Sequence, residues 1–474
     1  MNLNEHFIQQ INDLLPGAEA GALLEAIENG EAVTSVRCNS HKGFAPPSTL
    51  EKVPWCKMGA YLSERPQFTF DPHFHAGSYY VQDASSMIIY HVIKTLVTKP
   101  VTYLDLCAAP GGKTTAALQA LPQGSIVVAN EVVTARAQVL RENVVKWGLD
   151  NCMVTNDTPN TLGRLVNAFD VIAADVPCSG EGMFRKDAEA VAQWSPQLVA
   201  QCAARQRVIL ADMWPALKPG GLLIYSTCTY NTRENEEMVD FIVGKLGASV
   251  IEIPIPDDWN IHPAIERDYP CYRFFPGMVR GEGLFVCVMR KRWNGQRGMT
   301  MVEQRTSSKR SLPVSHFSSS RPLVLSSSCP REWITGDYDI IANNGSIIAV
   351  PRNIKASLMS RNGNIHIIKD LGVEIGVVKG KKTLPSHQLA LSQNLARGAF
   401  PEIDVDYHRA IAYLRGEAIT IDAPRGFVLI KYENAILGFV NNLGNRANNL
   451  YPKSWRILSS HLPDKPLVGP VNNS

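Results

Sequence analysis

Two cysteines stand in settings that suggest nucleophilic chemistry. Cys178 follows an apolar run that ends at Asp175, and Cys228 follows another that ends at Ser226-Thr227. If these runs are neighbouring parallel strands, their ends lie only about 5 Å apart, and both thiols would share one pocket. A single cysteine in an apolar context is usually inert packing. Two on adjacent loops, one of them after Asp-x-Pro, favour a chemical role.

Methylation of a pyrimidine at carbon 5 needs this set of groups. Carbon 5 is a poor nucleophile until a thiolate adds to carbon 6 and converts the ring into an enamine. Charge on N3 and on the exocyclic amine then needs a partner, a role that suits Asp175. A base must finally remove the carbon 5 proton, and the second cysteine can serve. Spacing alone leaves open which thiol attacks.

A glycine loop, DLCAAPGGKT at 105–114, joins a predicted strand to a predicted helix. Small residues let a ligand approach the backbone, and the helix start offers free N–H groups. A phosphate-binding P-loop would need glycine where Cys107 stands, and Pro110 disrupts the cradle. The G-x-G-x-x-G pattern of dinucleotide sites is absent. S-adenosylmethionine fits the loop, as does a plain tight turn.

Acidic residues at three consecutive strand ends favour a nucleoside above that loop. Glu131 lies about 20 residues beyond the glycines, where an acid accepts ribose hydroxyls. Asp157 ends the next strand, where a carboxylate or the adjacent backbone can meet an adenine amino group, and Asp175 ends the one after. Each acid alone could equally be a solvent-exposed residue at the end of a strand. The three together point to a nucleoside pocket.

Strand and helix patterns alternate from 101 to 289, which predicts an α/β fold with a doubly wound parallel sheet. Ligands of such sheets bind outside the carboxyl ends of the strands. We expect one long helical stretch over 188–217. The runs ASVIEIP and GLFVCVMRK are consistent with a terminal hairpin.

Composition bounds the class of protein. The 474 residues are 45% hydrophobic and 19% charged, which excludes a disordered chain, a coiled coil and a fibre. No run of eighteen apolar residues and no signal pattern occurs, so we expect a soluble, cytoplasmic protein with no membrane contact. The ten cysteines form no CxxC pair, so we expect no metal and no disulfide framework.

A Ser/Arg/Lys-rich segment divides the chain. We predict an N-terminal lobe at 1–78, a core domain at 79–293, a linker at 294–325 and a small, mostly β region at 326–474. Residues 1–294 carry 25 basic and 31 acidic side chains, whereas 295–474 carry 22 and 13. A basic tail is suited to a polyanion, although an ordinary basic surface is an equal alternative.

Four segments carry a resemblance to a known family: DLCAAPGGKT, DVPCSGEGMFRKD, Trp194-Ser195-Pro196 and KPGGLLIYSTCTYNTRENE. They resemble the Sun-type (Fmu/Nop) RNA cytosine-5 methyltransferases, and GEGMFRKD with the long C-terminal extension looks most like the members that act on small-subunit ribosomal RNA. The match covers roughly residues 30–292 and is weaker in the tail. It implies a Rossmann-like, S-adenosylmethionine-dependent core, an N-terminal RNA-binding lobe and a PUA-like tail.

The resemblance also implies roles for residues. Cys228 is the expected nucleophile, Cys178 assists product release, Asp175 contacts the cytosine and Lys113 faces the active site. The implied cofactor-binding residues are Cys107, Ala108, Ala109, Pro110, Gly111, Gly112, Lys113, Glu131, Asp157 and Asp175. Two departures from the family pattern, Cys38 where valine is usual and Val176 where alanine is usual, touch no reacting group.

Partners follow from the same resemblance. We expect a monomer that methylates small-subunit (16S) ribosomal RNA in the assembled subunit, with the cytosine flipped out of its stack. Candidate phosphate contacts in the tail are Lys379-Gly380-Lys381-Lys382 and Arg446.

Three alternatives remain open. One is a ribosome-assembly factor that binds RNA without catalysis, although such a protein needs neither thiol. Another is a DNA cytosine methyltransferase, in which the Pro-Cys thiol attacks. The third is a methyltransferase of another RNA.

Overall fold

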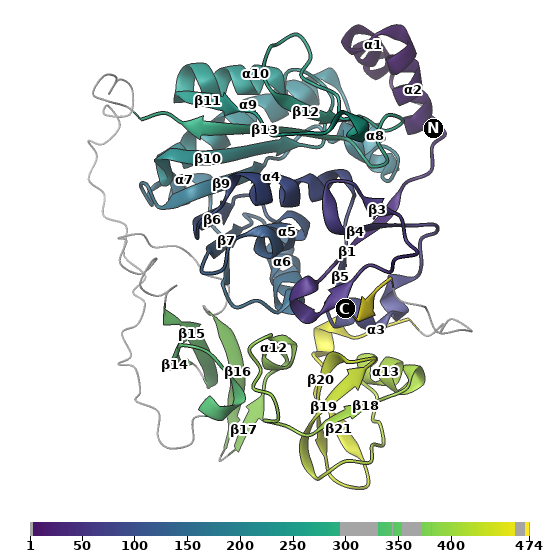
Figure 1. The fold of residues 1–474 in the computed structure, drawn as a ribbon, viewed down its shortest axis with the longest axis vertical. Helices are drawn as coiled ribbons and strands as arrows, with labels where there is room; N and C mark the ends of the chain where they lie inside the picture. Colours follow the sequence, from purple (N-terminus) through teal and green to yellow (C-terminus); the bar gives the residue numbers. More distant parts are fainter. Residues whose placement is uncertain are drawn as a thin grey trace.

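The computed structural model describes residues 3–293, 330–343, 345–352, 372–380, 382–459 and 470–473. An N-terminal part, a central α/β domain and a C-terminal module lie against one another (Figure 1). The predicted linker at 294–325 lies outside the described residues. In the described parts of the chain, no helix is long and apolar enough to cross a membrane.

An eight-stranded sheet within residues 102–291 forms the centre of the molecule. Its strand order is β8-β7-β6-β9-β10-β13-β11, and β12 pairs with β13. Strands β6 to β10 run parallel, and β13 is antiparallel to β10, β11 and β12. The bounds are β6 Thr102–Asp105, β7 Ile126–Asn130, β8 Cys152–Thr155, β9 Phe169–Asp175, β10 Leu217–Thr227, β11 Ala248–Ile251, β12 Cys271–Phe274 and β13 Leu284–Lys291. This confirms the doubly wound α/β class, and because β12 intervenes, β11 and β13 pair without forming a hairpin.

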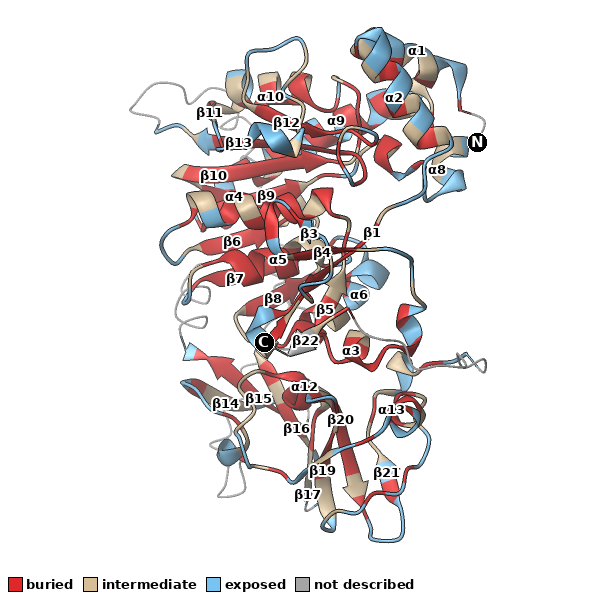
Figure 2. Ribbon diagram, turned by 45° about the vertical axis from the view of Figure 1, so that its right-hand side comes forward, coloured by how far each residue is buried: buried red, intermediate tan, exposed pale blue. Residues whose placement is uncertain are grey.

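Helices cover both faces of this sheet and bury its apolar side chains. One face packs against α4 (Ile88–Leu96), α5 (Gly112–Ala120) and α6 (Thr134–Trp147). The other packs against α7 (Pro159–Gly163), α9 (Pro196–Met213) and α10 (Glu236–Phe241). Figure 2 shows the central strands buried along most of their length. The carboxyl edge of the sheet is therefore held by a three-layer core.

The single helix expected over 188–217 is broken into two. Helix α8 spans Ala188–Gln193, and α9 begins at Pro196. The Ser195 hydroxyl caps α9 by accepting the Leu198 N–H at 3.1 Å. Proline at the first helical position has no N–H to lose, so Ser195-Pro196 starts a new helix here.

In the described residues, the N-terminal part contains three α-helices, of which α3 (Pro72–His75) is a single turn, and a small sheet. Helices α1 and α2 span Glu5–Leu14 and Gly17–Glu28. The sheet order is β3-β4-β1-β5, with β1 Thr34–Cys38, β3 Lys52–Val53, β4 Cys56–Leu62 and β5 Tyr79–Val81. Because β5 pairs with β1, this sheet extends to residue 81.

Arg37 fastens the N-terminal sheet to the core. Its buried guanidinium donates to the Thr115 hydroxyl at 2.6 Å and the Gln119 side-chain carbonyl at 2.5 Å, both on α5. It also reaches the Gly112 carbonyl at 3.3 Å and lies over the Trp147 ring. Burial lowers its pKa to about 10. The start of α5, next to the glycine loop, is thus positioned from outside its own domain.

The C-terminal module is small and mostly β, as predicted. Its strands form two sheets, β14-β15-β16-β17 and β18-β19-β20-β21. Helix α12 (His387–Leu391) lies between the two sheets in the chain, and α13 (Tyr407–Leu414) connects β18 to β19. The bounds are β14 Tyr338–Asn343, β15 Ser346–Pro351, β16 Val373–Lys379, β17 Lys382–Pro385, β18 Glu402–Asp404, β19 Gly426–Tyr432, β20 Ala435–Asn442 and β21 Ala447–Asn449.

This module packs directly on the rest of the chain. Strand β22 (Asn472–Asn473) pairs with β2 (Phe44–Ala45) of the N-terminal part. The Tyr407 hydroxyl donates to the Phe70 carbonyl at 3.0 Å, and both residues belong to one apolar cluster. The Gln393 N–H donates to the Gly148 carbonyl at 3.0 Å. The three parts therefore form a continuous packed structure.

Candidate active site

The two cysteines meet at the carboxyl edge of the sheet. Strands β9 and β10 are parallel neighbours, and Asp175 lies opposite Ser226 in their register. The loops that follow bring the Cys178 and Cys228 sulfurs to 3.2 Å, and both residues are partly buried. The adjacency that the sequence suggested is present.

Asp175 and Lys113 form an ion pair beside the thiols. The Lys113 ammonium lies 2.8 Å from Asp175 Oδ2, and the Ser226 hydroxyl donates to Oδ1 at 2.7 Å. Burial by itself lowers the pKa of Lys113, but Asp175 and Cys228 outweigh it, and the pKa is raised overall. The ammonium therefore stays charged next to Cys228.

Hydrogen bonding distinguishes the two thiols. The bond to Cys228, together with burial and the charge of Cys228, raises the pKa of Cys178 well above its ordinary value. Cys178 thus keeps its proton, and the geometry of the bond between the two sulfurs lets either of them donate. The Lys113 ammonium interacts electrostatically with the Cys228 sulfur.

The glycine loop wraps over the ends of β6 and β7. Gly111 adopts φ +114°, a conformation that suits glycine, and a side chain at Gly112 would lie 3.3 Å from the Tyr80 ring. The Ala108 N–H donates to the Asn130 carbonyl at 2.8 Å. The Ala109 and Pro110 carbonyls accept from Arg136 and Asn143. Burial raises the pKa of the Cys107 thiol, so this third cysteine stays protonated.

The acids at the strand ends surround this loop. Glu131, directly after β7, is buried and accepts the Val133 N–H at 2.9 Å while Arg136 lies 3.3 Å away. Asp157 is half-buried two residues after β8. Asp105, the last residue of β6, accepts from the Thr114 hydroxyl at 2.6 Å. The predicted cofactor residues therefore lie together on one edge of the sheet.

Several residues that build the site were not singled out from sequence. Asn130 ties three strand ends together, donating to the Leu106 and Asp157 carbonyls and accepting the Asp157 N–H. Ser226 orients Asp175. A polar residue closing an apolar strand is the signal that could have revealed both. Two buried glutamates, Glu181 and Glu234, lie behind the cysteine loops.

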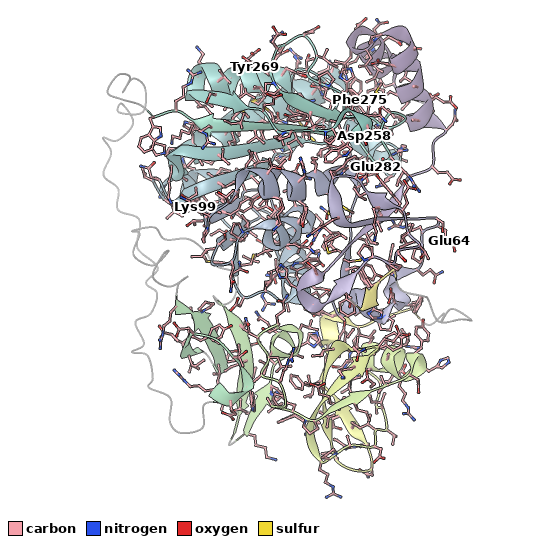
Figure 3. The ribbon with its side chains drawn as sticks, in the orientation of Figure 1. Glu64, Lys99, Asp258, Tyr269, Phe275 and Glu282 are labelled. Atoms are coloured by element: carbon pink, nitrogen blue, oxygen red, sulfur yellow. The ribbon has the colours of Figure 1, made fainter. Side chains whose placement is uncertain are left out.

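Asp105 makes folding stability depend on pH. Burial raises its pKa to about 7, above the ordinary value of 3.8. Between these values the unfolded chain loses a proton that the folded chain keeps, so the free energy of unfolding falls as pH rises toward 7. We expect Asp105→Asn to flatten this decline in urea unfolding between pH 5 and pH 8. Asp258→Asn, at an exposed aspartate labelled in Figure 3, should leave it unchanged; equal slopes in both variants would contradict the assignment.

The pocket residues fit S-adenosylmethionine. Asp105 Oδ1 is buried without a partner and can accept from a donor of the cofactor. Glu131 offers carboxylate oxygens where a ribose is expected, and the glycine loop allows close approach of the backbone. In the described residues, no group of three His, Cys, Asp or Glu side chains is arranged to hold a metal ion. The fold and this site define a Rossmann-like, S-adenosylmethionine-dependent methyltransferase.

Comparison with known families gives a narrower assignment. Residues 96–290 match the model of the 16S rRNA methyltransferase RsmB/F, residues 3–84 the N-terminal domain of 16S rRNA methyltransferase RsmF, and residues 400–457 the methyltransferase RsmF PUA domain. Ribosomal RNA small subunit methyltransferase F from Shewanella loihica is 30% identical over 85% of this chain and 83% of the relative. The protein of that name from Erwinia tasmaniensis is 27% identical over 94% and 95%. The chain belongs to the RsmF family of 16S rRNA methyltransferases.

Solved structures agree on the fold of the central part. A methyltransferase homolog protein from Pyrococcus horikoshii matches with a TM-score of 0.52 and 25% identity over 61% of this chain and 95% of that chain. NSun6 from Pyrococcus horikoshii matches with a TM-score of 0.51 and 19% identity over 61% and 98%.

Proposed function

We propose that this protein methylates carbon 5 of a cytosine in small-subunit (16S) ribosomal RNA through a covalent bond between Cys228 and the base. The observation that carries the proposal is the 3.2 Å pair of cysteine sulfurs beside the Lys113–Asp175 ion pair, on the edge that holds the glycine loop. Family membership and the names of the relatives support the methyl-transfer class and the RNA.

The first step is attack of the Cys228 thiolate on carbon 6 of the cytosine. Lys113 stabilises the thiolate by its charge, and Cys178 does so by its hydrogen bond. As the C6–S bond forms, the electrons of the C5=C6 bond move into the ring toward N3. Asp175, oriented by Ser226, accepts from the exocyclic amine, and N3 takes up a proton that neutralises its charge and leaves when carbon 5 receives the methyl group. S-adenosylmethionine, when bound over the glycine loop, supplies the electrophilic methyl group that carbon 5 receives.

The second step releases the product. The C5–H bond breaks, its electrons restore the C5=C6 bond, and the C6–S electrons return to Cys228 as a thiolate. Cys178 is placed to receive the carbon 5 proton. While Cys228 is bound to carbon it no longer raises the pKa of Cys178, because its hydrogen bond and its charge are gone. Cys178 can then lose its own proton to solvent and act as the base.

The RNA must present an unstacked base to this edge, and the C-terminal module offers positive charge to hold the surrounding strand. Lys379 and Lys382 are exposed at the turn between β16 and β17, and Arg446 is exposed before β21. Lys381 lies outside the described residues. We propose that these side chains contact phosphates, and that a monomer acts on the assembled small subunit.

A double substitution tests those contacts. Lys379→Ala with Lys382→Ala should weaken RNA binding and reduce the slope of log affinity against log salt by about 0.7 for each lost contact. Lys99→Ala, at an exposed lysine of the core labelled in Figure 3, is the matched control. A salt slope unchanged from wild type in the double variant would assign these lysines to an ordinary solvated surface.

The proposed function is tested by labelled methyl transfer. The protein is incubated with S-adenosylmethionine carrying a labelled methyl group and with small subunits or naked 16S RNA that lack the modification. We expect 5-methylcytosine in the RNA, more with the subunit than with naked RNA, and a stable protein–RNA adduct when 5-fluorocytosine replaces cytosine. Label at another atom of the RNA, or no label, would reject the proposal, and a preference for naked RNA would reject the assembled substrate.

A further inference from the structure

Glu181 lies at the junction of the two cysteine loops. It is fully buried, three residues after Cys178. Its Oε2 accepts two backbone N–H groups from the loop that follows Cys228, Tyr230 at 2.6 Å and Asn231 at 3.1 Å. The Glu181 side chain, which belongs to the Cys178 loop, therefore accepts from two backbone N–H groups of the Cys228 loop in place of backbone carbonyls.

The second oxygen of Glu181 is equally occupied. Oε1 accepts from the Trp194 indole N–H at 3.1 Å, the Asn231 amide at 3.0 Å and the Gln10 amide at 3.0 Å. Gln10 belongs to α1, so the N-terminal helix pair also bonds to this carboxylate. Each of these five partners is an N–H donor, and a group that only accepts suits all of them.

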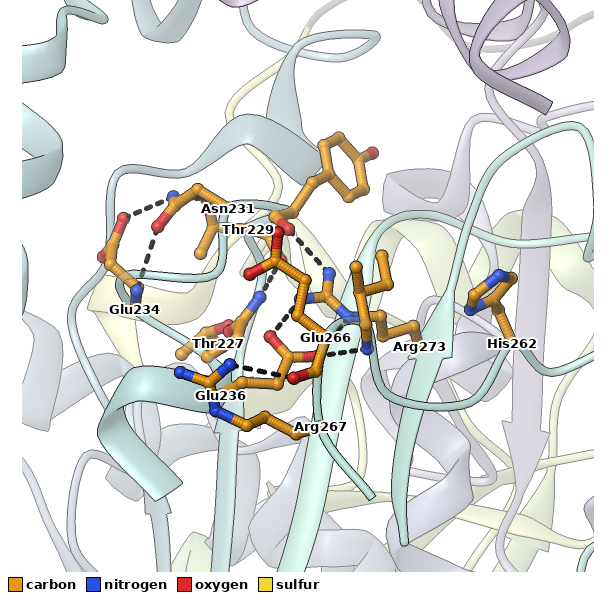
Figure 4. A network of polar contacts seen from close by, with 12 residues as sticks. Thr227, Thr229, Asn231, Glu234, Glu236, His262, Glu266, Arg267 and Arg273 are labelled. Carbon is orange, nitrogen blue, oxygen red and sulfur yellow. Dashed lines mark hydrogen bonds and ion pairs between the residues drawn. The ribbon is translucent and has the colours of Figure 1, made fainter. Parts of the chain in front are cut away.

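Glu234 makes the reciprocal link. It lies on the chain after Cys228 and accepts the Ser179 N–H at 3.1 Å, next to Cys178. It also accepts from the Asn231 amide at 2.9 Å, a contact drawn in Figure 4, and from Gln206 at 2.8 Å. Finally, the Gly182 N–H donates to the Cys228 carbonyl at 2.8 Å. Each cysteine loop is thus held by a carboxylate from the other.

We propose that Glu181 is a positioning residue that sets the separation of the Cys178 and Cys228 sulfurs. It touches neither thiol and acts through the backbone of both loops. Its consequence for turnover rests on the proposed function, since two-thiol chemistry needs both sulfurs placed to within a fraction of an ångström. In Glu181→Gln, an amide N–H₂ group replaces one of the two carboxylate oxygens and faces N–H donors. The hydrogen bonds to that oxygen are therefore lost, whichever way the amide is turned.

The separation of the sulfurs can be measured without RNA or cofactor. A diazene dicarboxamide oxidises two thiols to a disulfide: one thiolate adds to the N=N bond, the second displaces it from sulfur, and the reagent leaves as the hydrazine. The rate of Cys178–Cys228 disulfide formation, followed by peptide mass spectrometry on the full-length protein, reports how often the sulfurs meet. Methylation kinetics are measured in parallel.

We expect Glu181→Gln to slow disulfide formation at least about fivefold and to lower kcat at least about tenfold, with KM for RNA within about twofold. Glu189→Gln, the same change at an exposed carboxylate on α8, should alter neither rate. If Glu181→Gln does not fold, Glu181→Asp, which keeps both acceptor oxygens but shortens the reach, is judged by the same criterion. A folded variant that forms the disulfide at the wild-type rate overturns the proposal. If Glu181→Gln slows disulfide formation but the wild-type protein methylates no RNA, the result rejects the proposed function and not the positioning role of Glu181.

Discussion

Replacing Cys228 with alanine is expected to abolish both the covalent RNA complex and methyl transfer, a loss of about 10⁴-fold or more, because the sulfur that bonds carbon 6 in the proposed mechanism is removed. Cys178→Ala should give the opposite result. Its adduct with ordinary cytosine RNA should form and persist, since Cys228 still attacks but no thiol is placed 3.2 Å away to take the carbon 5 proton. Denaturing gel electrophoresis of protein–RNA mixtures separates the two outcomes.

Cys202→Ala, on α9 outside both loops, is the matched control and should behave as wild type. An adduct that survives in Cys228→Ala and disappears in Cys178→Ala would exchange the two roles. That pattern would make Cys178, in the Pro-Cys setting, the nucleophile.

Asp175→Asn is expected to lower kcat by about 10²- to 10³-fold while the fold is kept. The substitution removes the carboxylate that pairs with Lys113 at 2.8 Å and that we place opposite the exocyclic amine of the base. Without it, Lys113 keeps its burial but loses the main influence that raises its pKa. The decline should appear in kcat, measured with saturating RNA and cofactor.

Asp170→Asn offers a control on the same strand. Asp170 also lies on β9 and pairs with Lys218 at 2.6 Å, far from the carboxyl edge. It should leave kcat unchanged. Similar losses in both variants would show that any broken ion pair on β9 disturbs the core, and the role of Asp175 would fall.

Much of the site could be predicted because its signals are local. Gly-Gly before a helix, and acids or cysteines just after apolar runs, are read directly from a short window, and a parallel sheet then brings neighbouring strand ends together. Asp175, Cys178 and Cys228 are of this kind, and so is Gly111. The helix start at Ser195-Pro196 could also have been predicted, because serine followed by proline is typical of the start of a helix. The helical composition on both sides favoured one continuous helix instead.

The remaining features depend on contacts between distant segments. Arg37 lies 78 residues from Thr115 in sequence, and Gln10 lies 171 residues from Glu181, so no local pattern links them. A buried glutamate looks like a surface one until its partners are known, and Asn130 shows its role only when three strand ends converge. The reacting groups could thus be predicted from the sequence, whereas the residues that position them are recognised only in the tertiary structure.

An apolar seam crosses the boundary between the N-terminal part and the C-terminal module. Phe44 and Phe70 of the N-terminal part lie in one cluster with Tyr407 and Leu414 of the C-terminal module, and strand β22 returns to pair with β2. Cutting the chain at residue 326 would open this seam to water. RNA binding measured on the shortened protein would then reflect its altered solubility as much as its lost RNA contacts. A chimera between relatives should therefore exchange residues 34–81 and 400–473 together.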